Sequence, residues 1–252
     1  MNGLSFCVVD TITNKILAFE RVNFKTQLTP YLMLKELKEK LSKQGEVGRN
    51  FSEVMVIHKN NMFSLVPKPL FNKEELPNYL KFNAKIMAND LIAYDEIPNQ
   101  EIINVYIPYT NVNNYIFELF GEFEFKHSGT VLINTLLKQN RTSSEPVCYV
   151  QVSERETEMM VMSDKKLLFY NQFEYSNKED FLYYLLFSLE QLQMDLEKIN
   201  LKLFGSIEEG DAIYELCYQY IKNVSVFVPS NPSFPMEQLE NESIDFSILS
   251  SL

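Results

Sequence analysis

Residues 146–173, PVCYVQVSERETEMMVMSDKKLLFYNQF, contain three patterns typical of β-strands, at 148–152, 157–162 and 167–173. Two short polar turns, SERE at 153–156 and SDKK at 163–166, separate these patterns. Apolar residues occupy both faces of the third pattern, as they do in a strand whose sheet is covered by helices. The segment therefore predicts a meander of three strands that leads into an α/β domain.

A helix pattern follows the meander. Ser176 and Glu179 have the spacing of a capping box, which predicts that the helix starts at Ser176. Apolar residues then recur at helical spacing, at Phe181, Leu185, Leu189, Leu192 and Leu196. Next come a strand pattern at 201–204, a turn at Gly205, a second helix pattern and a strand pattern at 224–228. The order β-β-β-α-β-α-β predicts a mixed sheet with crossover helices.

The preceding part of the chain shows a similar order of patterns. Its expected elements are a hairpin at 4–10 and 15–21, helices at 30–43, 73–82, 111–120 and 128–139, and strands at 54–57, 63–66, 90–97, 102–107 and 122–126. Pro30 suits the first turn of its helix, and Asn111 is expected to cap another. We expect the strand at 63–66 to pair with that at 54–57 or to extend a sheet edge. The similar order in both parts predicts an internal structural repeat.

The polar stretch at 139–146 ends in Pro146 and is the expected domain boundary. We predict a first α/β half at 1–142, a second at 143–230 and a Pro-rich C-terminal tail at 231–252. The tail carries four apolar residues near its end, Ile244, Phe246, Ile248 and Leu249. Because these side chains are too apolar to stay solvated, we expect the tail to pack on the body of the protein or on a partner.

Composition excludes several classes of function. The 252-residue chain is 46% apolar, enough for one large core or two smaller ones, and its formal net charge is −11. Nucleic acids and anionic membranes bind clustered Lys and Arg, so neither is an expected partner. We expect neither a signal peptide nor a membrane span, because no long apolar run is present. Three widely spaced cysteines favour a reducing compartment, which predicts a cytoplasmic protein.

Four short phrases carry a resemblance to a known superfamily: FSLVP at 63–67, NVYIP at 104–108, HSG at 127–129 and LFG at 203–205. Together with two successive halves that each begin with a hairpin, they make the chain resemble the actin-like ATPase (ribonuclease H-like) superfamily. More narrowly, the chain resembles an uncharacterised bacterial family with this fold. The resemblance implies an α/β protein of two tandem subdomains, with mixed sheets, hairpin starts and crossover helices. Pilus-assembly scaffold proteins belong to the same superfamily, so the fold need not imply turnover.

Active members of this superfamily hold nucleotide phosphates between two hairpins that contain Asp, Gly and a small hydroxyl residue, and they contact adenosine through a glycine pair. Here the first hairpin, DTITNK at 10–15, keeps Asp10 and Thr11 but has no glycine. The second, QVSERE at 151–156, has neither Asp nor Gly and adds two glutamates that repel phosphate. The third motif, FGSI at 204–207, keeps a single glycine. The resemblance implies Asp10, Thr11, Gly205 and Ser206 as candidate cofactor-binding positions, and ATP hydrolysis is not expected.

Each of these candidates also has a structural interpretation. Asp10 is expected to accept hydrogen bonds from amides of its own turn. Gly205 is expected to supply the positive φ of a strand-to-helix turn. His58 and His127 have no ligand at metal spacing in the sequence, so we predict structural roles for them and no metal site.

Other conspicuous residues also have structural explanations. Cys7, Cys148 and Cys217 lie in apolar patterns typical of inert, buried thiols. The acidic cluster at 154–158 is expected to be a solvated hairpin tip. The aromatic residues Tyr183, Tyr184 and Phe187 continue a helix pattern and are interpreted as interdomain core rather than as a cofactor site.

Three functions compete. The favoured hypothesis is a non-catalytic actin-like protein that acts through protein–protein contacts or self-association, without catalytic residues or a cofactor. The alternative is a residual binder of nucleotide or another small ligand in an interdomain cleft. A ribonuclease H-type nuclease would need convergent acids, to which Asp10 and Asp90 could contribute, and a basic groove that the net charge argues against.

Overall fold

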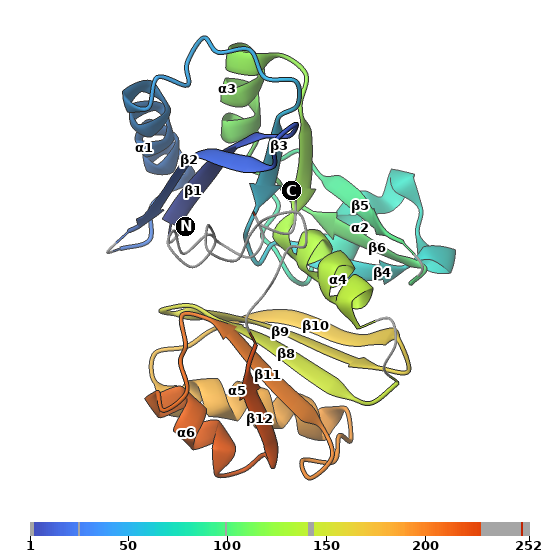
Figure 1. Cartoon of the computed structure of the whole chain (residues 1–252). Helices are drawn as coiled ribbons and strands as arrows, with labels where there is room; N and C mark the ends of the chain where they lie inside the picture. The colour runs from blue at the N-terminus through green and yellow to red at the C-terminus, as the bar shows by residue number, and fades with distance from the viewer. Residues whose placement is uncertain (1–2, 25, 99, 141–143, 228–247, 249–252) are drawn as a thin grey trace. The chain divides into compact units, whose positions relative to one another are not determined.

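A computed structural model describes residues 3–24, 26–98, 100–140, 144–227 and 248. Within them the chain forms a mixed α/β fold of twelve strands, six α-helices and two short 3-10 helices (Figure 1). It divides into two compact units between Leu132 and Ile133, inside helix α4 (Ser128–Gln139). The predicted boundary at 142–143 lies outside the described residues, and so does the predicted tail at 231–252 with the exception of residue 248. Both stay predictions.

The second unit contains one sheet of five strands in the order β10-β9-β8-β11-β12. Its strands are β8 (Val147–Val152), β9 (Glu156–Ser163), β10 (Lys166–Glu174), β11 (Asn200–Gly205) and β12 (Asn223–Val226). The first three form the predicted antiparallel meander, and β11 pairs in parallel with both β8 and β12. The sheet predicted from residues 146–227 is confirmed.

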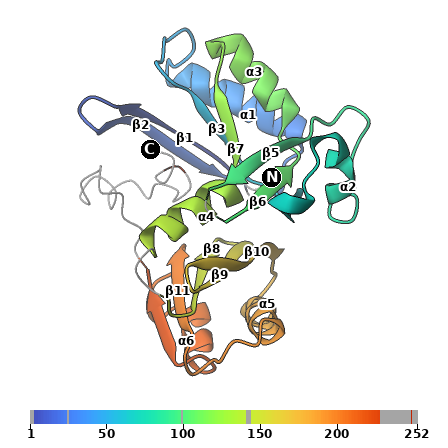
Figure 2. The ribbon, with the colours of Figure 1, turned by 90° about the vertical axis from the view of Figure 1, so that its right-hand side faces the viewer.

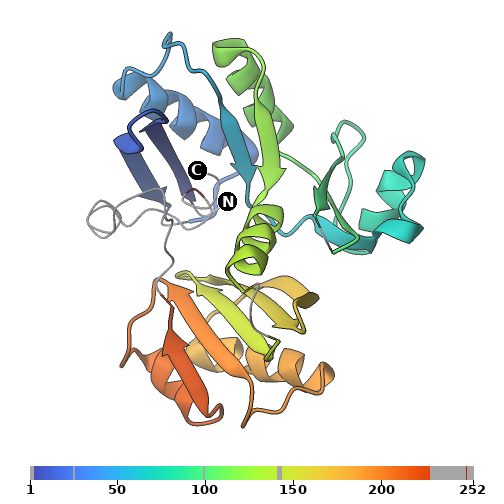
Figure 3. The same cartoon turned by 45° about the vertical axis from the view of Figure 1, so that its right-hand side comes forward.

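Helices α5 (Lys178–Gln191) and α6 (Ala212–Tyr218) lie on the same face of this sheet (Figures 1 and 3). Apolar side chains from α5 fill the space beneath it, because Phe181, Leu185 and Leu189 recur once per helical turn. They pack in one core with strand residues such as Val150 and Leu203. The buried core is thus continuous from the helices to the sheet.

The predicted start and end of α5 are wrong. The helix is capped by Asn177, whose side chain accepts from the amide of Asp180, and not by Ser176. Both residues can cap, and Asn177 is one residue nearer the apolar stripe. The helix ends at Gln191 because Gln193 adopts a positive φ of 55°. Leu192 and Leu196 therefore lie beyond the helix, although both still pack against its core.

The first unit begins with the predicted hairpin, β1 (Gly3–Asp10) and β2 (Lys15–Asn23). A separate parallel pair consists of β3 (Met55–His58) and β7 (Glu124–His127), which lie side by side in Figure 3. Helices α1 (Pro30–Lys43) and α3 (Thr110–Phe120) pack next to each other (Figure 2). One core joins these elements, formed by Met33, Leu41, Val112 and Ile116 with partly buried residues such as Phe6 and Val56.

A third sheet of the first unit has the order β4-β6-β5 and is entirely antiparallel. Its strands are β4 (Phe63–Pro67), β5 (Ala93–Ile97) and β6 (Ile102–Tyr106), and helix α2 (Leu76–Leu80) packs against it. Two short 3-10 helices, Lys68–Leu70 and Lys73–Glu75, connect β4 to α2. The predicted pairing of 63–66 with 54–57 is wrong, since β4 pairs with β6, but β4 is an edge strand as the adjoining proline suggested.

Three local predictions in the first unit also need correction. Asn111 does not cap α3; the helix already begins at Thr110, and the Asn111 side chain donates to the Pro30 carbonyl at 2.8 Å. The helix expected at 73–82 is only five residues long, Leu76–Leu80. Pro77 has no amide to continue an α-helix back into residues 73–75, which form a 3-10 helix instead. The strand expected from 90 begins at Ala93, since Asp90 closes a turn with Met87.

Candidate functional site

The first candidate position is the turn between β1 and β2. One carboxylate oxygen of Asp10 accepts from the amides of Ile12 and Thr13, at 2.8 and 3.2 Å. The other accepts from the Thr13 hydroxyl at 2.8 Å. The Thr13 hydroxyl and these two amides lower the pKa of Asp10. Asp10 therefore accepts hydrogen bonds from its own turn, as predicted. Thr11 and Ile12 of this turn are exposed.

The second candidate position is the end of β11. Gly205 has a φ of +96°, and a Cβ added there would lie 2.4 Å from the carbonyl oxygen of Val152. The amide of the next residue, Ser206, donates to that same carbonyl at 2.8 Å. Two requirements of the fold, a positive φ and a close approach of β11 to β8, thus account for the glycine.

The amides around these turns are already bonded within the chain. Besides Ser206, the amide of Ser153 donates to the Glu156 carbonyl at 2.9 Å in the β8–β9 turn. Exposed carboxylates follow on both neighbouring loops, from Glu154 and from Glu208 and Glu209. A phosphate group here would meet bonded amides and negative charge, which is the opposite of an anion-binding site.

The expected solvated acidic cluster at 154–158 is only partly correct. Glu154 and Arg155 are exposed, but Glu158 is only 1% exposed and its carboxylate accepts from the Tyr170 hydroxyl at 2.8 Å. Glu158 lies two residues inside β9, so the sheet buries it. Tyr170 on the paired strand β10 supplies the hydrogen bond that a buried carboxylate needs.

The two histidines end the paired strands β3 and β7, where they lie opposite each other in the register. Nδ1 of His58 accepts from the Tyr109 amide at 3.3 Å, and Nε2 lies 2.8 Å from Oδ1 of Asn113. Nδ1 of His127 accepts from the Gly129 amide at 3.1 Å, and Nε2 lies 2.9 Å from the Asn60 carbonyl. Both rings are therefore neutral with the proton on Nε2, since Nδ1 faces an N–H donor in each case.

Asp95 completes this buried polar cluster. Its carboxylate accepts from the His127 amide at 2.9 Å and from the Tyr106 hydroxyl at 3.1 Å. Burial raises the pKa of Asp95, and burial together with the nearby carboxylate raises that of Tyr106. Asp95 comes from a strand 32 residues before His127, so the spacing of residues along the chain does not reveal this contact.

No group of three or more His, Cys, Asp or Glu side chains within the described residues could hold a metal ion. Two of the three cysteines are buried as expected, whereas Cys7 is only partly buried, so the expectation of a buried thiol is wrong there. Cys148 and Cys217 are buried in the core of the second unit. Burial raises the pKa of both thiols, to about 12 for Cys217, so both are protonated and inert at neutral pH.

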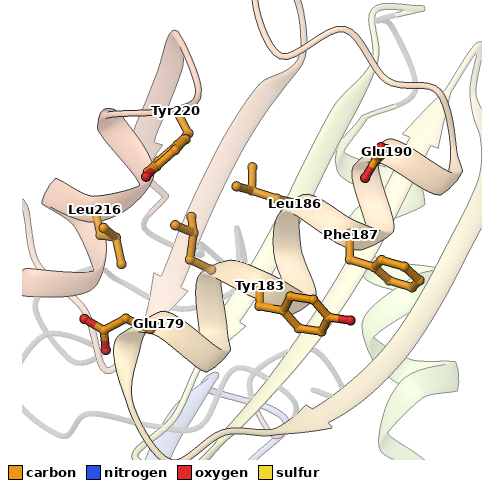
Figure 4. A pocket seen from close by; sticks show the side chains of 8 residues that line it. Glu179, Tyr183, Leu186, Phe187, Glu190, Leu216 and Tyr220 are labelled. Atoms are coloured by element: carbon orange, nitrogen blue, oxygen red, sulfur yellow. The ribbon is translucent and has the colours of Figure 1, made fainter.

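A pocket of about 380 Å³ between α5 and α6 has no assigned role (Figure 4). Its lining is mainly apolar and aromatic, from Leu182, Tyr183, Leu186, Phe187, Leu216 and Tyr220. Two carboxylates, Glu179 and Glu190, complete the lining. We call this feature the α5–α6 groove.

The aromatic side chains of the groove are strongly exposed. Tyr183 is 60% exposed, Phe187 47% and Tyr220 52%. The rings of Tyr183 and Phe187 stack on each other, with centroids 5.7 Å apart. The opposite side of α5 fills the core of the second unit, so these two rings are not part of that core, and their interpretation as interdomain core stays a prediction. Tyr184 alone turns inward, where it stacks on Phe173 at 4.8 Å.

Comparison with known families identifies the chain. Residues 1–224 match a family described as "Protein of unknown function (DUF3822)". The chain belongs to the DUF3822 family. This confirms the predicted resemblance to a family of unknown function. No protein of curated function matches the DUF3822 chain by sequence.

Solved structures define the fold of this DUF3822 protein. A crystal structure from Bacteroides thetaiotaomicron, described as an actin-like ATPase fold of unknown function, is similar with a TM-score of 0.80 and 20% identity, covering 95% of this chain and 92% of that one. A PilM–PilN type IV pilus biogenesis complex is similar with a TM-score of 0.62 and 13% identity, covering 98% and 94%. These similarities show the fold alone, and they confirm the predicted α/β actin-like fold. The internal repeat of two tandem subdomains stays a prediction.

The α5–α6 groove of the DUF3822 protein was missed by sequence reasoning, although a signal was present. Tyr183 and Phe187 are four residues apart and two residues out of phase with the buried row that starts at Phe181. Two residues correspond to about 200° around a helix, so the helix has apolar rows on opposite sides. One row forms the core and the other predicts a second contact surface.

Proposed function

We propose that this protein acts without catalysis, through contacts with other protein chains, and that nucleotide chemistry is not part of its activity. The observation that carries the proposal is the hydrogen bonding of the turns that correspond to phosphate contacts. The amides of Ile12 and Thr13 donate to Asp10, and the amide of Ser153 donates to the Glu156 carbonyl. Phosphate binding needs free, convergent amides, and these are engaged within the chain.

Two further observations support action through protein contacts. Exposed, contiguous aromatic surface typically marks an interaction site, and the α5–α6 groove exposes three aromatic side chains. A protein of the same fold is found in the PilM–PilN complex, so this fold is compatible with stable protein assembly. Fold similarity alone does not carry the partner over to this chain.

The net charge and the free thiols support the proposed class of partner and the proposed location. A net charge of −11 disfavours nucleic acid and anionic membranes as partners. No helix in the described part of the chain is long and apolar enough to cross a membrane. The three cysteines are free thiols, as is usual in a reducing compartment, and we propose a cytoplasmic location.

Equilibrium dialysis with labelled ATP and Mg²⁺, together with an assay of phosphate release, tests the proposal. We expect no retained nucleotide and no phosphate release above a protein-free control. Asp10→Ala is the matched variant, since a metal-orienting role would place its carboxylate at the centre of any nucleotide site. Retention of ATP that disappears in this variant would overturn the proposal and establish the alternative, a residual nucleotide-binding protein.

A further inference from the structure

The α5–α6 groove has a floor that suits an apolar helix. Leu182 and Leu186 lie one helical turn apart on α5 and line the groove. Leu216 of α6 lines it opposite Leu186 (Figure 4). Side chains at the spacing of Leu182 and Leu186 lie about 5–6 Å apart along a single ridge of the helix. The ridges of another helix pack into the grooves beside such a ridge. Tyr183 and Phe187 continue the apolar surface along the outer side of α5.

The two ends of the groove are acidic. Glu179 and Glu190 are eleven residues apart on α5, which corresponds to about 16 Å along the helix. None of the ion pairs within the described residues involves either carboxylate. Helices α5 and α6 together carry four acidic residues and a single basic one, Lys178. The electrostatic potential at the groove therefore favours a cationic occupant.

The same charges argue against two other occupants. The C-terminal segment 229–252 has four acidic residues and no Lys or Arg, so its charge matches that of the groove instead of complementing it. A second copy placed groove to groove would bring two sets of these carboxylates together. Like charges placed opposite each other at an interface cost binding energy.

We propose that the α5–α6 groove binds an amphipathic helical segment of a partner protein, with apolar side chains on the leucine floor and Lys or Arg at both acidic ends. This inference rests on the proposed function and specifies its contact surface. Arg or Lys near the stacked rings of Tyr183 and Phe187 gains a cation–π contact in addition to the carboxylates. Aromatic residues in such a position commonly contribute most of the binding energy.

A pair of fluorescein-labelled peptides of about 14 residues tests the proposal. Both carry Leu or Phe at positions i, i+3, i+4 and i+7; one has Lys at every polar position and the other has Glu. Fluorescence anisotropy is measured with the full-length protein at low and at raised salt. We expect the Lys peptide to bind and to weaken as salt rises, and the Glu peptide not to bind.

Matched variants show whether peptide binding depends on the groove residues or only on the overall negative charge of the protein. Tyr183→Ser combined with Phe187→Ser is expected to weaken binding of the Lys peptide about tenfold or more. Tyr218→Ser is the control, because Tyr218 is 59% exposed on α6 and does not line the groove. Likewise Glu190→Gln is expected to weaken binding about threefold. Glu215→Gln, an exposed α6 carboxylate outside the groove, should have no effect.

The outcomes distinguish the inference from the proposed function. Equal binding of both peptides, or equal effects of Tyr183→Ser/Phe187→Ser and Tyr218→Ser, would overturn the groove assignment. A dimer in light scattering that the groove variants dissociate would instead make a second copy the occupant, which also overturns it. Melting temperatures of all variants are measured alongside, and nucleotide dialysis on the same samples reports on the proposed function independently.

Discussion

In the second unit five strands form one continuous sheet, whereas the strands of the first unit fall into three smaller sheets. Both units nevertheless follow a related order: a hairpin, then a helix, a strand, a helix and a strand. In the first unit the chain between β3 and α3 forms the additional sheet β4-β6-β5, and the hairpin lacks the third strand that β10 supplies in the second. The same order of elements thus accommodates one sheet or several.

The interiors of the two units also differ. In the second unit one apolar core runs from α5 to the sheet, and the buried Glu158 of the sheet is bonded by Tyr170. In the first unit a buried polar cluster around His58, His127 and Asp95 binds strand and loop backbone through side-chain hydrogen bonds. Where strands are not continued by a neighbouring strand, their polar groups need other partners. The comparison teaches that the second unit depends on apolar packing and the first partly on side-chain hydrogen bonds.

Removing apolar packing from the second unit should have the largest effect. Phe181→Ala deletes a side chain that is 1% exposed and is expected to lower the free energy of unfolding by about 3–5 kcal/mol. Tyr183→Ala, two residues away on the same helix and 60% exposed, should cost less than about 1 kcal/mol. Urea denaturation of both variants measures the difference. Similar losses would contradict the assignment of the two faces of α5.

Acid should selectively weaken the first unit through His58. Burial lowers the pKa of His58 from 6.5 to about 4, so the unfolded chain binds the proton more readily. The stability that neutral His58 supplies is complete above pH 6.5 and is lost as the pH falls towards 4, by an amount of the order of 3 kcal/mol. The raised pKa of Asp95 acts in the opposite direction, since its contribution is lost as the pH rises above its ordinary value of 3.8.

The variant His58→Gln distinguishes the effect of His58 on stability from that of Asp95. It is expected to be less stable at neutral pH and to show a flatter fall in the urea midpoint between pH 6.5 and pH 4. An unchanged slope would assign the acid sensitivity to another group and remove His58 from the comparison.

A smaller effect should distinguish two glycines with similar backbone. Gly205 and Gly210 have φ values of +96° and +93°, but only Gly205 has backbone atoms where a Cβ would lie. Gly210→Ala should cost about 1 kcal/mol for the positive φ alone, and Gly205→Ala about 2–3 kcal/mol because β11 must also move away from β8. Equal melting temperatures for the two variants would show that the approach of Gly205 to Val152 is not a constraint.

Much of the fold could be predicted from sequence because periodic patterns report directly on helix and strand faces. The meander at 146–173 was found because apolar runs and polar turns alternate there, and α1 and α4 were predicted with the residue bounds that the structure shows. What failed were long-range pairings and caps. The partner of β4 is β6, some forty residues further along the chain, and nothing in residues 63–66 specifies it. The cap of α5 was predicted one residue too early, because Ser176 and Asn177 are both good caps.

The candidate site was predictable to a lesser degree. Asp10 and Gly205 were predicted to have turn roles on motif grounds, and both have them in the structure. Their role towards a ligand stays a prediction. The contact of Asp95 with His127 was not predictable, because it joins residues from different strands. The α5–α6 groove depends on where α6 lies beside α5, which helical periodicity alone does not give.

The most direct test of the central claim is the melting temperature of the full chain with and without saturating ATP and Mg²⁺. The account predicts no change within error, because the amides at the turns are bonded within the chain. A ligand at a hundredfold excess over its dissociation constant would stabilise the protein by about 2.7 kcal/mol, which raises the melting temperature by roughly 5–10 °C. A rise of that size, abolished by Asp10→Ala, would contradict the account.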